Sequence, residues 1–309
     1  MRYIILISIL LLAVLTAGCT GESGSTGNAI SAGYSEDIEI KGSDTLLQMV
    51  SNMAEAYTVK NKNAKISVTG GGSGTGIAAL INGEIDIADA SRAIKKKELT
   101  QAKDKGIDPW EFIIAQDMLS VIVNKDNPVA ELTIEQVSEI YKGQITNWNN
   151  AGGEDKEITL YGRQSTSGTY SYFMKKIVEG DYSSKMMNME GNQAIVDAVR
   201  QDKTAIGYVG VGYIVDDNGN QINGIKIIKL SKDMNSDYIS PLDKTKRADY
   251  PISRPLFQYL SKKPLKDSAV YKFLVFELSE EGQKIVKKSG FIPITAEDRE
   301  HNNALLKKI

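Results

Sequence analysis

The amino-acid sequence predicts an α/β fold for most of its 309 residues. Short runs rich in apolar and β-branched residues alternate with segments whose apolar residues recur at helical spacing. Glycine, serine and threonine separate many of these segments, as expected of turns. There is no internal repeat and no long run of like charge. Strands that alternate with helices in this way are typical of α/β architecture.

The first residues of the chain predict an export signal. Arg2 precedes an uncharged apolar run at 4–15, and small residues lead from this run to Cys19, the only cysteine. Such a pattern is typical of secretory signals, and about twelve apolar residues are too few for a comfortable membrane span. We therefore predict a signal peptide at 1–18, followed by a lipidated N-terminus and flexible linker at 19–36.

Cys19 has two interpretations. It is either an ordinary thiol or the lipid-bearing residue of a lipoprotein signal, which the segment resembles and which we favour. A diacylated cysteine carries the two chains that stable membrane anchoring requires. We expect an extracytoplasmic protein anchored at the cell surface.

Composition limits the possible functions. The chain has 37 basic and 39 acidic residues and a net charge of −2, which becomes −3 when Arg2 leaves with the signal. This mild acidity argues against a nucleic-acid-binding surface. A single cysteine allows no disulfide within the chain, so the fold depends on core burial. The remaining length of about 270 residues is enough for a large core or for two lobes.

The secondary-structure elements follow from local patterns. The stripe of apolar residues in Thr45–Lys60 predicts an amphipathic helix, and Thr133–Gln136 predicts a capping box at the start of another. Asp267–Gly290 predicts two further helices that separate near Ser279. The predicted strands are Ile38–Lys41, Lys65–Thr69, Ile85–Ala88, Phe112–Ala115, Leu119–Asn124, Ile158–Tyr161, Ala205–Val209, Ile225–Leu230 and Leu256–Leu260.

One turn is especially informative. Arg163–Thr169, with the sequence RQSTSGT, lies between a predicted strand and an apolar-striped segment that begins at Tyr170. The first amides of a helix lack internal partners and that end is partly positive, so an oxyanion can bind there. An arginine adds a planar fork of donors that fits two oxygens of phosphate or sulfate. The segment therefore predicts a site for a tetrahedral oxyanion.

Two other turns have the same design. Gly42–Thr45 and Gly70–Gly76 each follow a predicted strand and precede a predicted helix. Glycines allow a ligand to approach the backbone, hydroxyls donate hydrogen bonds, and ligands of open α/β sheets bind beyond the carboxyl ends of strands. Each turn alone is also compatible with simple helix capping, and the second lacks the lysine of a nucleotide-binding P-loop. The three turns together favour an oxyanion site.

Eight short segments carry a family resemblance. They are GSDTL at 42–46, GSGTG at 72–76, ASR at 90–92, ITNW at 145–148, RQSTSGT at 163–169, AIGYV at 205–209, GQ at 282–283 and GFIP at 290–293. Through them, nearly all of Ile38–Ile294 resembles the PstS-type phosphate-binding proteins of ABC-type phosphate importers. Any one segment alone is weak, whereas the fifth and sixth are specific in combination.

The resemblance implies which residues bind phosphate. Thr45 and the amide of Leu46 match the first contact, and Ser73 matches the hydroxyl of the glycine-rich turn. Arg163 matches the charged clamp, and the hydroxyls and amides after it complete the site. The expected site consists of Ser43, Asp44, Thr45, Leu46, Ser73, Ser91, Arg92, Arg163, Ser167, Gly168 and Thr169.

Two positions depart from the family pattern. Many members carry, in the segment occupied here by Ser91 and Arg92, an aspartate that accepts the proton of hydrogen phosphate; one branch has Ser-Arg as here. Ser165 stands where other members carry an aspartate paired with the clamp arginine. Asp44 is then the candidate for rejecting sulfate, or else only the N-cap of the first helix. Arg92 either contacts the anion, as we expect, or forms a salt bridge outside the cleft.

The resemblance also implies the architecture and the function. The fold would be the two-lobed periplasmic-binding-protein type II fold with a hinge between the lobes. Lobe 1 would comprise 37–118 plus 254–309, and lobe 2 would comprise 119–253. A monomer, held at the membrane by its N-terminal lipid, would bind inorganic phosphate between the lobes with high affinity and deliver it to the permease subunits of an ABC importer.

Other functions remain as alternatives. The anion is otherwise sulfate, molybdate or tungstate, since proton count and size decide among them. A phosphatase or phosphotransferase would need Ser167 or Thr169 as its nucleophile, yet His301, the only histidine, lies in the polar C-terminal tail. We expect no enzyme activity, no cofactor and no metal.

Overall fold

The structure is a computed structural model that describes residues 36–216 and 218–309, which belong to one compact unit. The predicted signal peptide and Cys19 lie outside these residues. So does the predicted linker, apart from Glu36, with which the first strand begins. Within the described ranges, none of the helices combines the length and the apolar sequence needed to cross a membrane.

The predicted alternation of strands and helices is confirmed. The strands are β1 Glu36–Gly42, β2 Ala64–Thr69, β3 Ile87–Ala90, β4 Trp110–Asn124, β5 Glu131–Thr133, β6 Thr159–Arg163, β7 Met187–Met189, β8 Ala205–Gly210, β9 Ile225–Ile227, β10 Lys229–Ser231 and β11 Ser253–Leu260. The α-helices are α1 Leu47–Lys60, α2 Ser73–Asn82, α3 Lys96–Asp104, α4 Ile134–Lys142, α5 Gly168–Phe173, α6 Asn192–Gln201, α7 Ala269–Leu278, α8 Glu280–Lys288 and α9 Ala296–Leu306. Shorter helical turns are η1 Trp148–Ala151, η2 Met174–Val178, η3 Val211–Tyr213 and η4 Arg247–Asp249.

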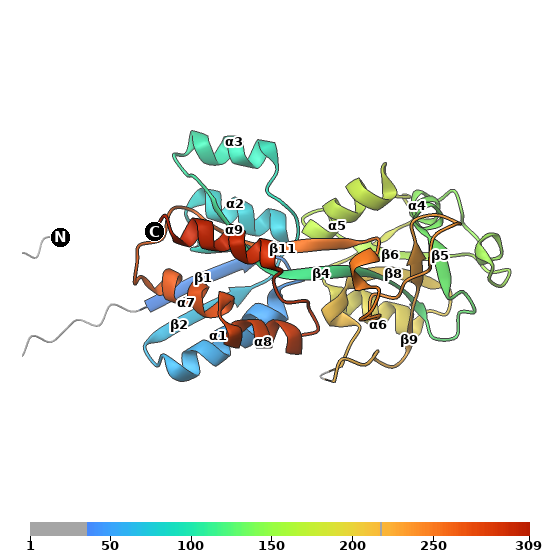
Figure 1. The fold of residues 1–309 in the computed structure, drawn as a ribbon. Helices are drawn as coiled ribbons and strands as arrows, with labels where there is room; N and C mark the ends of the chain where they lie inside the picture. The colour runs from blue at the N-terminus through green and yellow to red at the C-terminus, as the bar shows by residue number, and fades with distance from the viewer. Residues whose placement is uncertain (1–35, 217) are drawn as a thin grey trace, which may run out of the picture. The chain divides into compact units, whose positions relative to one another are not determined.

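The sheet orders these strands as β2-β1-β3-β11-β4-β8-β6-β7, and β9 also pairs with β4. β1 pairs in parallel with β2 and β3, and β6 pairs in parallel with β7 and β8. β4 and β11 are antiparallel to each other and to their other neighbours. In Figure 1, β4 and β11 run together through the middle of the molecule, with β1, β2, α1 and α2 on one side and α4, α5, α6 and β6 on the other.

β4 changes its hydrogen-bonding partner along its length. Its first part pairs with β11, up to the pair Met118–Ser253, and its second part pairs with β8, starting at Leu119–Gly210. The sequence predicts two separate strands here, and this prediction is wrong because the chain stays extended through Gln116 and Asp117. The strand predicted at Ile225–Leu230 is instead divided into β9 and β10, which join different sheets.

Local sequence explains the helix boundaries. Thr133 Oγ1 accepts a hydrogen bond from Gln136 N, and Gln136 Oε1 accepts one from Thr133 N, so the predicted capping box opens α4. Ser279 follows α7 and caps α8 through a hydrogen bond from Gly282 N, which confirms the predicted pair of helices. α9 was not predicted, because its sequence is polar.

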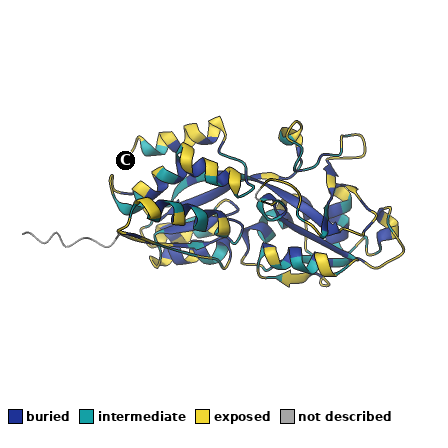
Figure 2. Ribbon diagram, turned by 90° about the horizontal axis from the view of Figure 1, so that it is seen from below, coloured by how far each residue is buried: buried dark blue, intermediate teal, exposed yellow. Residues whose placement is uncertain are grey.

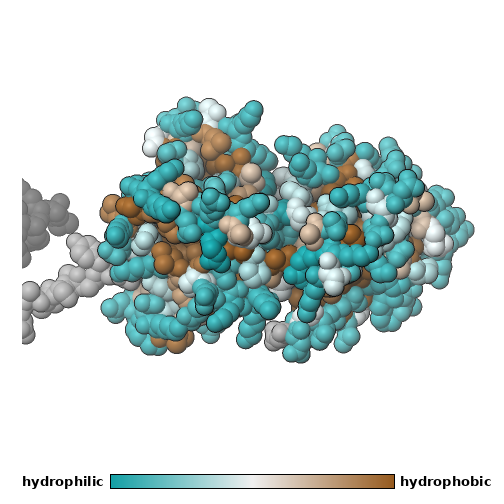
Figure 3. Space-filling model, in the orientation of Figure 1, coloured by the Kyte–Doolittle hydropathy of each residue, from teal (hydrophilic) through white to brown (hydrophobic). Residues whose placement is uncertain are grey.

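One continuous hydrophobic core extends along the sheet, from the half that contains β1 to the half that contains β8. It includes Ile40, Met53 and Phe273 on one side and Val121 and Ile206 on the other. The strands are mainly buried while the helices expose their outer faces (Figure 2). The face drawn in Figure 3 is mostly polar, with apolar residues scattered over it. The core therefore holds both sides of the sheet together.

Candidate functional site

Four chain segments bring their polar residues to one place. β1, β2 and β3 are parallel neighbours, so the residues that follow them lie together at one edge of the sheet. The fourth segment is the turn between β6 and α5, more than 120 residues from the first along the chain. The first and fourth segments meet where Thr45 Oγ1 lies 2.9 Å from Thr169 Oγ1.

Five buried hydroxyl residues, which we call the hydroxyl cluster, form the centre of this place. They are Ser43, Thr45, Ser73, Ser91 and Thr169, and each is at most 3% exposed. Ser43 Oγ donates to Ser91 Oγ at 2.9 Å. Ser91 Oγ lies 3.3 Å from Ser73 Oγ and 3.4 Å from Thr169 Oγ1. The structure thus brings five of the predicted site residues into direct contact.

Two glycines allow the turns to approach so closely. A Cβ atom on Gly168 would lie 2.2 Å from Ser73 Oγ, and one on Gly72 would lie 2.6 Å from Thr166 O. Gly74 N donates to Thr166 O at 2.9 Å. Contacts as short as 2.2 Å exclude a side chain, so the glycine-rich turn packs directly against the turn before α5.

Three predicted residues have local roles in these turns. Ser167 is the N-cap of α5, and its Oγ accepts a hydrogen bond from Tyr170 N. Gly168 is the first residue of α5. The Leu46 amide, which the resemblance assigns to the anion, donates instead to Ser43 O at 3.0 Å, and the Leu46 side chain is fully buried. The geometry therefore does not support Leu46 as an anion donor.

Arg163, at the end of β6, is 1% exposed and only partly satisfied. Its Nη2 donates to Asp44 Oδ2 at 2.5 Å and to Glu190 O at 2.6 Å. Among the described residues, none accepts a hydrogen bond from its Nε or Nη1, although both atoms are buried. Unpaired buried guanidinium donors are costly unless a ligand binds them. Arg163 therefore has two donors available for a bound anion.

Asp44 does not cap the first helix, which corrects one of the two interpretations of this residue. The N-cap of α1 is Leu46, without a side-chain hydrogen bond. Asp44 Oδ1 accepts from Gly71 N at 2.9 Å, and Oδ2 pairs with Arg163. Asp44 thus supplies the carboxylate partner of Arg163 that Ser165 cannot supply.

Arg92 forms the salt bridge that was the alternative to anion contact. Its Nη1 and Nη2 donate to the two carboxylate oxygens of Glu98 at 2.8 and 2.6 Å, and Nη1 also donates to Ala93 O. Its Nε is buried and has no partner among the described residues. The two terminal nitrogens of Arg92 are therefore directed at Glu98, and the geometry does not support the expected anion contact through them.

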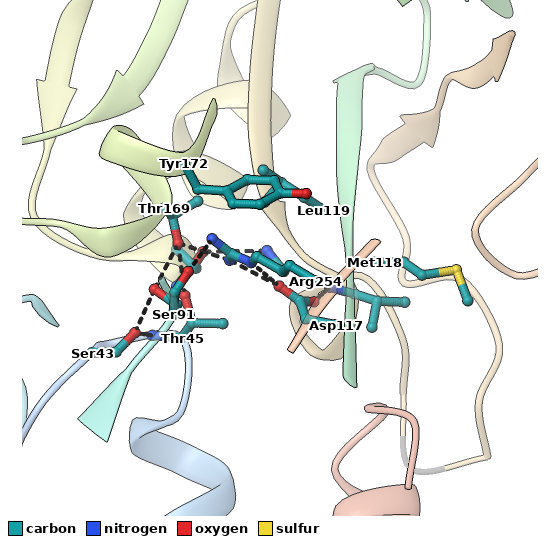
Figure 4. A network of polar contacts seen from close by, with 12 residues as sticks. Ser43, Thr45, Ser91, Asp117, Met118, Leu119, Thr169, Tyr172 and Arg254 are labelled. Atoms are coloured by element: carbon teal, nitrogen blue, oxygen red, sulfur yellow. Dashed lines mark hydrogen bonds and ion pairs between the residues drawn. The ribbon is translucent and has the colours of Figure 1, made fainter. Parts of the chain in front are cut away.

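A buried ion pair that was not predicted from the sequence lies beside the hydroxyl cluster. Arg254 and Asp117 lie opposite each other on β11 and β4. Arg254 Nε and Nη2 donate to Asp117 Oδ2 at 3.0 and 2.8 Å, and Nη2 also donates to Thr169 Oγ1 at 2.9 Å. Figure 4 shows the guanidinium of Arg254 between Asp117 and the hydroxyls. Neither residue lies within a strand predicted from the sequence, because Asp117 falls between two predicted strands and Arg254 lies just before a third.

Two further buried carboxyls, Asp89 of β3 and Glu277 of α7, are bridged by one side chain. Gln258 Nε2 donates to Asp89 Oδ1 at 3.1 Å and to Glu277 Oε1 at 3.0 Å. Burial, partly offset by the hydrogen bond from Gln258, raises the pKa of Asp89 to about 7. Burial and the nearby Asp89 carboxyl raise the pKa of Glu277 well above its ordinary value. Both carboxyls therefore keep their protons to higher pH than exposed carboxyls do.

Comparisons with known proteins agree with this geometry. The family model described as the PBP superfamily domain matches residues 24–281. The phosphate-binding protein PstS of Staphylococcus epidermidis strain RP62A is 37% identical over 276 residues, which cover 88% of this chain and 82% of that protein. PstS of Staphylococcus aureus strain USA300 is 35% identical, and the match covers 90% of this chain and 84% of that protein. The chain belongs to the PstS family.

Solved structures of similar proteins share the fold. One from Clostridium perfringens, described as a putative phosphate ABC transporter substrate-binding protein with bound phosphate, has a TM-score of 0.72 and 31% identity. It is matched over its whole length and over 84% of this chain. An ABC-type phosphate transport receptor from Vibrio cholerae has a TM-score of 0.65 and 30% identity. The match covers 83% of this chain and 100% of that chain.

Family membership makes the two departures in this chain more informative. Arg92 stands in the segment where the resemblance implies an aspartate in many members, and it pairs with Glu98. Ser165 stands where the resemblance implies an aspartate, and Arg163 here pairs with Asp44, which comes from a different turn. Arg163 is thus paired with a carboxylate that lies 119 residues away along the chain.

Proposed function

We propose that this protein binds inorganic phosphate at the hydroxyl cluster and delivers it to an ABC-type phosphate importer. The observation that carries the proposal is the convergence of five buried hydroxyls from four chain segments. Arg163 Nε and Nη1 add two buried donors without partners among the described residues. Hydroxyl and guanidinium donors match the acceptor oxygens of phosphate, and relatives with this fold are named for phosphate.

The anion would bind between two lobes, with the boundaries expected from the sequence: 37–118 plus 254–309, and 119–253. The change of partner along β4, between Met118 and Leu119, supports a boundary there. Thr45 and Ser73 would bind from lobe 1, and Arg163 and Thr169 from lobe 2. A ligand that contacts both lobes favours the closed arrangement because the open one lacks half of the contacts.

Isothermal titration of the purified protein with phosphate, arsenate, sulfate, molybdate and tungstate tests the proposal. We expect saturable phosphate binding, competition by arsenate because of its similar shape and protonation, and much weaker binding of the other three. Tighter binding of sulfate, molybdate or tungstate than of phosphate would assign the site to another oxyanion.

An enzymatic role is the weaker candidate. The hydrogen-bond partners of Ser167 and Thr169 are hydroxyls, an amide and Arg254, none of which acts as a general base. His301 Nε2 lies 3.1 Å from Glu111 O, at the start of β4. We expect no turnover of a chromogenic phosphomonoester, and measurable turnover would replace binding with catalysis.

The cellular setting extends the same proposal. A lipid on Cys19 would hold the protein, as a monomer, at the outer surface of the membrane near its permease. Labelling of the unmodified chain with a radioactive fatty acid, and loss of the label in Cys19→Ser, would support this anchoring. An unlabelled chain would mean that Cys19 is an ordinary thiol.

A further inference from the structure

Arg254 and Asp117 occupy a special position in the sheet. They are opposite one another on β11 and β4, and only the pair Met118–Ser253 lies between them and the point where β4 changes its partner from β11 to β8. The side chains of Arg254 and Asp117 are 1% and 0% exposed. A buried ion pair is retained only where further hydrogen bonds satisfy both groups, so the partners of this pair matter.

The partners of the ion pair come from both sides of the sheet. Arg254 Nη1 donates to Ser91 O at 2.9 Å, at the end of β3. Arg254 Nη2 donates to Thr169 Oγ1, and Asp117 Oδ1 accepts from Val211 N at 3.0 Å, just after β8. The ion pair therefore links β4 and β11 to the residue after β3 and to Thr169 of α5, both of which belong to the hydroxyl cluster, and to the residue after β8.

α5 contacts Arg254 at a second point. The guanidinium carbon of Arg254 lies 5.2 Å from the centre of the Tyr172 ring, and Figure 4 shows this ring beside the guanidinium. Tyr172 Oη donates to Ser253 O at 2.8 Å. Thr169 and Tyr172 are both residues of α5, so this helix is held against β11 by the hydrogen bond that Thr169 accepts, the one that Tyr172 donates, and the ring contact.

The bond to Thr169 fixes the direction of its hydroxyl. A guanidinium only donates hydrogen bonds, so Thr169 Oγ1 accepts from Arg254 and keeps its own proton for another acceptor. Ser73 Oγ accepts a hydrogen bond from Ser91 N, and Ser43 Oγ accepts one from Thr45 N. Each of these two neighbouring hydroxyls therefore also accepts from a group that can only donate. The donor to Thr169 is the charged one, and charge-assisted bonds are the stronger kind.

We propose that Arg254, held in place by Asp117, is a positioning residue of the anion site that acts through Thr169. It orients the Thr169 hydroxyl as a donor toward the bound anion. This inference rests on the proposed function, because it assigns a role within the same phosphate site. It also gives a purpose to a buried charge pair whose two members lie 137 residues apart.

A double-mutant cycle in the full chain tests this role. Phosphate affinity is measured by isothermal titration for the unmodified chain, Arg254→Lys, Thr169→Val and the double variant. Lysine keeps the charge but cannot bind Asp117 and Thr169 with the same fork of donors. We expect each single change to weaken binding by at least about tenfold, the scale of one charge-assisted hydrogen bond. In the Thr169→Val background, Arg254→Lys should then cost less than about twofold, because its target is gone.

The outcomes separate the possible failures. An unmodified chain that does not bind phosphate would overturn the proposed function. A chain that binds phosphate while Arg254→Lys leaves the affinity unchanged, or costs the same factor with and without Thr169 Oγ1, would overturn only the role of Arg254. A merely structural arginine would lower the melting temperature without this coupling.

Two further variants complete the design. Arg299→Lys changes an exposed arginine on α9 and should leave the affinity unchanged. Asp117→Asn keeps the shape of the partner and weakens its hold on Arg254. If Arg254→Lys does not fold, the same cycle is run with Asp117→Asn, and an equal loss in both Thr169 backgrounds would again refute the role.

Discussion

Each of three buried arginines around the hydroxyl cluster faces a carboxylate. The pairs are Arg163 with Asp44, Arg92 with Glu98, and Arg254 with Asp117. These pairs contribute no net charge to the site. A bound anion would therefore be stabilised by oriented hydroxyls and by the remaining donors of Arg163, rather than by an excess of positive charge.

Asp44→Asn tests how the clamp arginine is held. The substitution removes the charge that pairs with Arg163, so the guanidinium loses its orientation and we expect phosphate affinity to fall by at least about 1.4 kcal/mol, or tenfold. Both oxygens of Asp44 are already bonded, so the preference for phosphate over sulfate should stay the same. Competition titrations with the two anions measure this, and a narrower preference would instead support Asp44 as the residue that rejects sulfate.

Asp89→Asn tests the buried acidic pair. Folding raises the pKa of Asp89 to about 7, so between about pH 4 and pH 7 the folded state binds a proton that the unfolded state has released. Stability therefore falls as pH rises through this window, by at most about 1.4 kcal/mol per pH unit from this group. Asparagine does not ionise, so this loss of stability with rising pH disappears. Its side-chain oxygen still accepts the hydrogen bond from Gln258.

Urea unfolding of both proteins at about pH 5 and about pH 8 measures the effect. We expect the stability of Asp89→Asn, measured as its free energy of unfolding minus that of the unmodified chain, to be greater at the higher pH. Parallel pH profiles would show that Asp89 ionises in the folded state as easily as in the unfolded one.

At this scale the sequence predicted some residues and not others. Ser43, Thr45, Ser73 and Thr169 belong to local patterns, a strand followed by a polar turn and a helix, which the chain displays openly. Arg254 has no such pattern, because its role depends on the pairing of β11 with β4. The partner of Arg163 was also missed, since only the folded structure brings Asp44 next to it.

The start of α5 is the element on which the site depends most closely. It approaches the glycine-rich turn so tightly that a Cβ atom on Gly168 would meet Ser73 Oγ at 2.2 Å and Ser91 Oγ at 2.7 Å. The position of α5 relative to the other turns is thus set by the absence of a side chain at one residue.

Gly168→Ala should displace α5 and separate the hydroxyls. We expect phosphate affinity to fall by about tenfold or more, with a loss of about 1–3 kcal/mol in the free energy of unfolding from overpacking. Gly180→Ala is the matched control, because its Cβ would meet no atom closer than the flexible end of Lys142, at 3.4 Å. Isothermal titration and urea unfolding give the two quantities, and unchanged affinity in Gly168→Ala would mean that the turns need not be so close.

α9, β5 and β7 were not predicted from the sequence, for two different physical reasons. α9 docks on β4 through polar groups, with Asn302 bonded to the backbone of Ile113 and Asp298 bonded to Gln116, so it has no clear apolar stripe. β5 and β7 have three residues each, too few to show a periodic pattern. Their extended conformation is set by the strands next to them.

At the scale of the whole molecule, the sequence predicted the α/β class and, through its resemblance, the family. The continuity of β4 was not predicted, because the polar residues Gln116 and Asp117 interrupt its apolar run. Those same residues are bonded to other elements in the fold, Gln116 to Asp298 and Asp117 to Arg254. Polar residues inside a strand were here a sign of tertiary contacts rather than of a turn.

The unbroken course of β4 has a consequence for how the protein denatures. One strand gives backbone hydrogen bonds to β11 in its first part and to β8 and β9 in its second, and one apolar cluster spans both. If either half of the sheet unfolded, the other half would lose β4 as a central strand. We expect a single peak in a heat scan, with equal calorimetric and van't Hoff enthalpies, despite a boundary that would otherwise invite two independent transitions. Two resolved peaks would mean that the halves come apart as separate folding units.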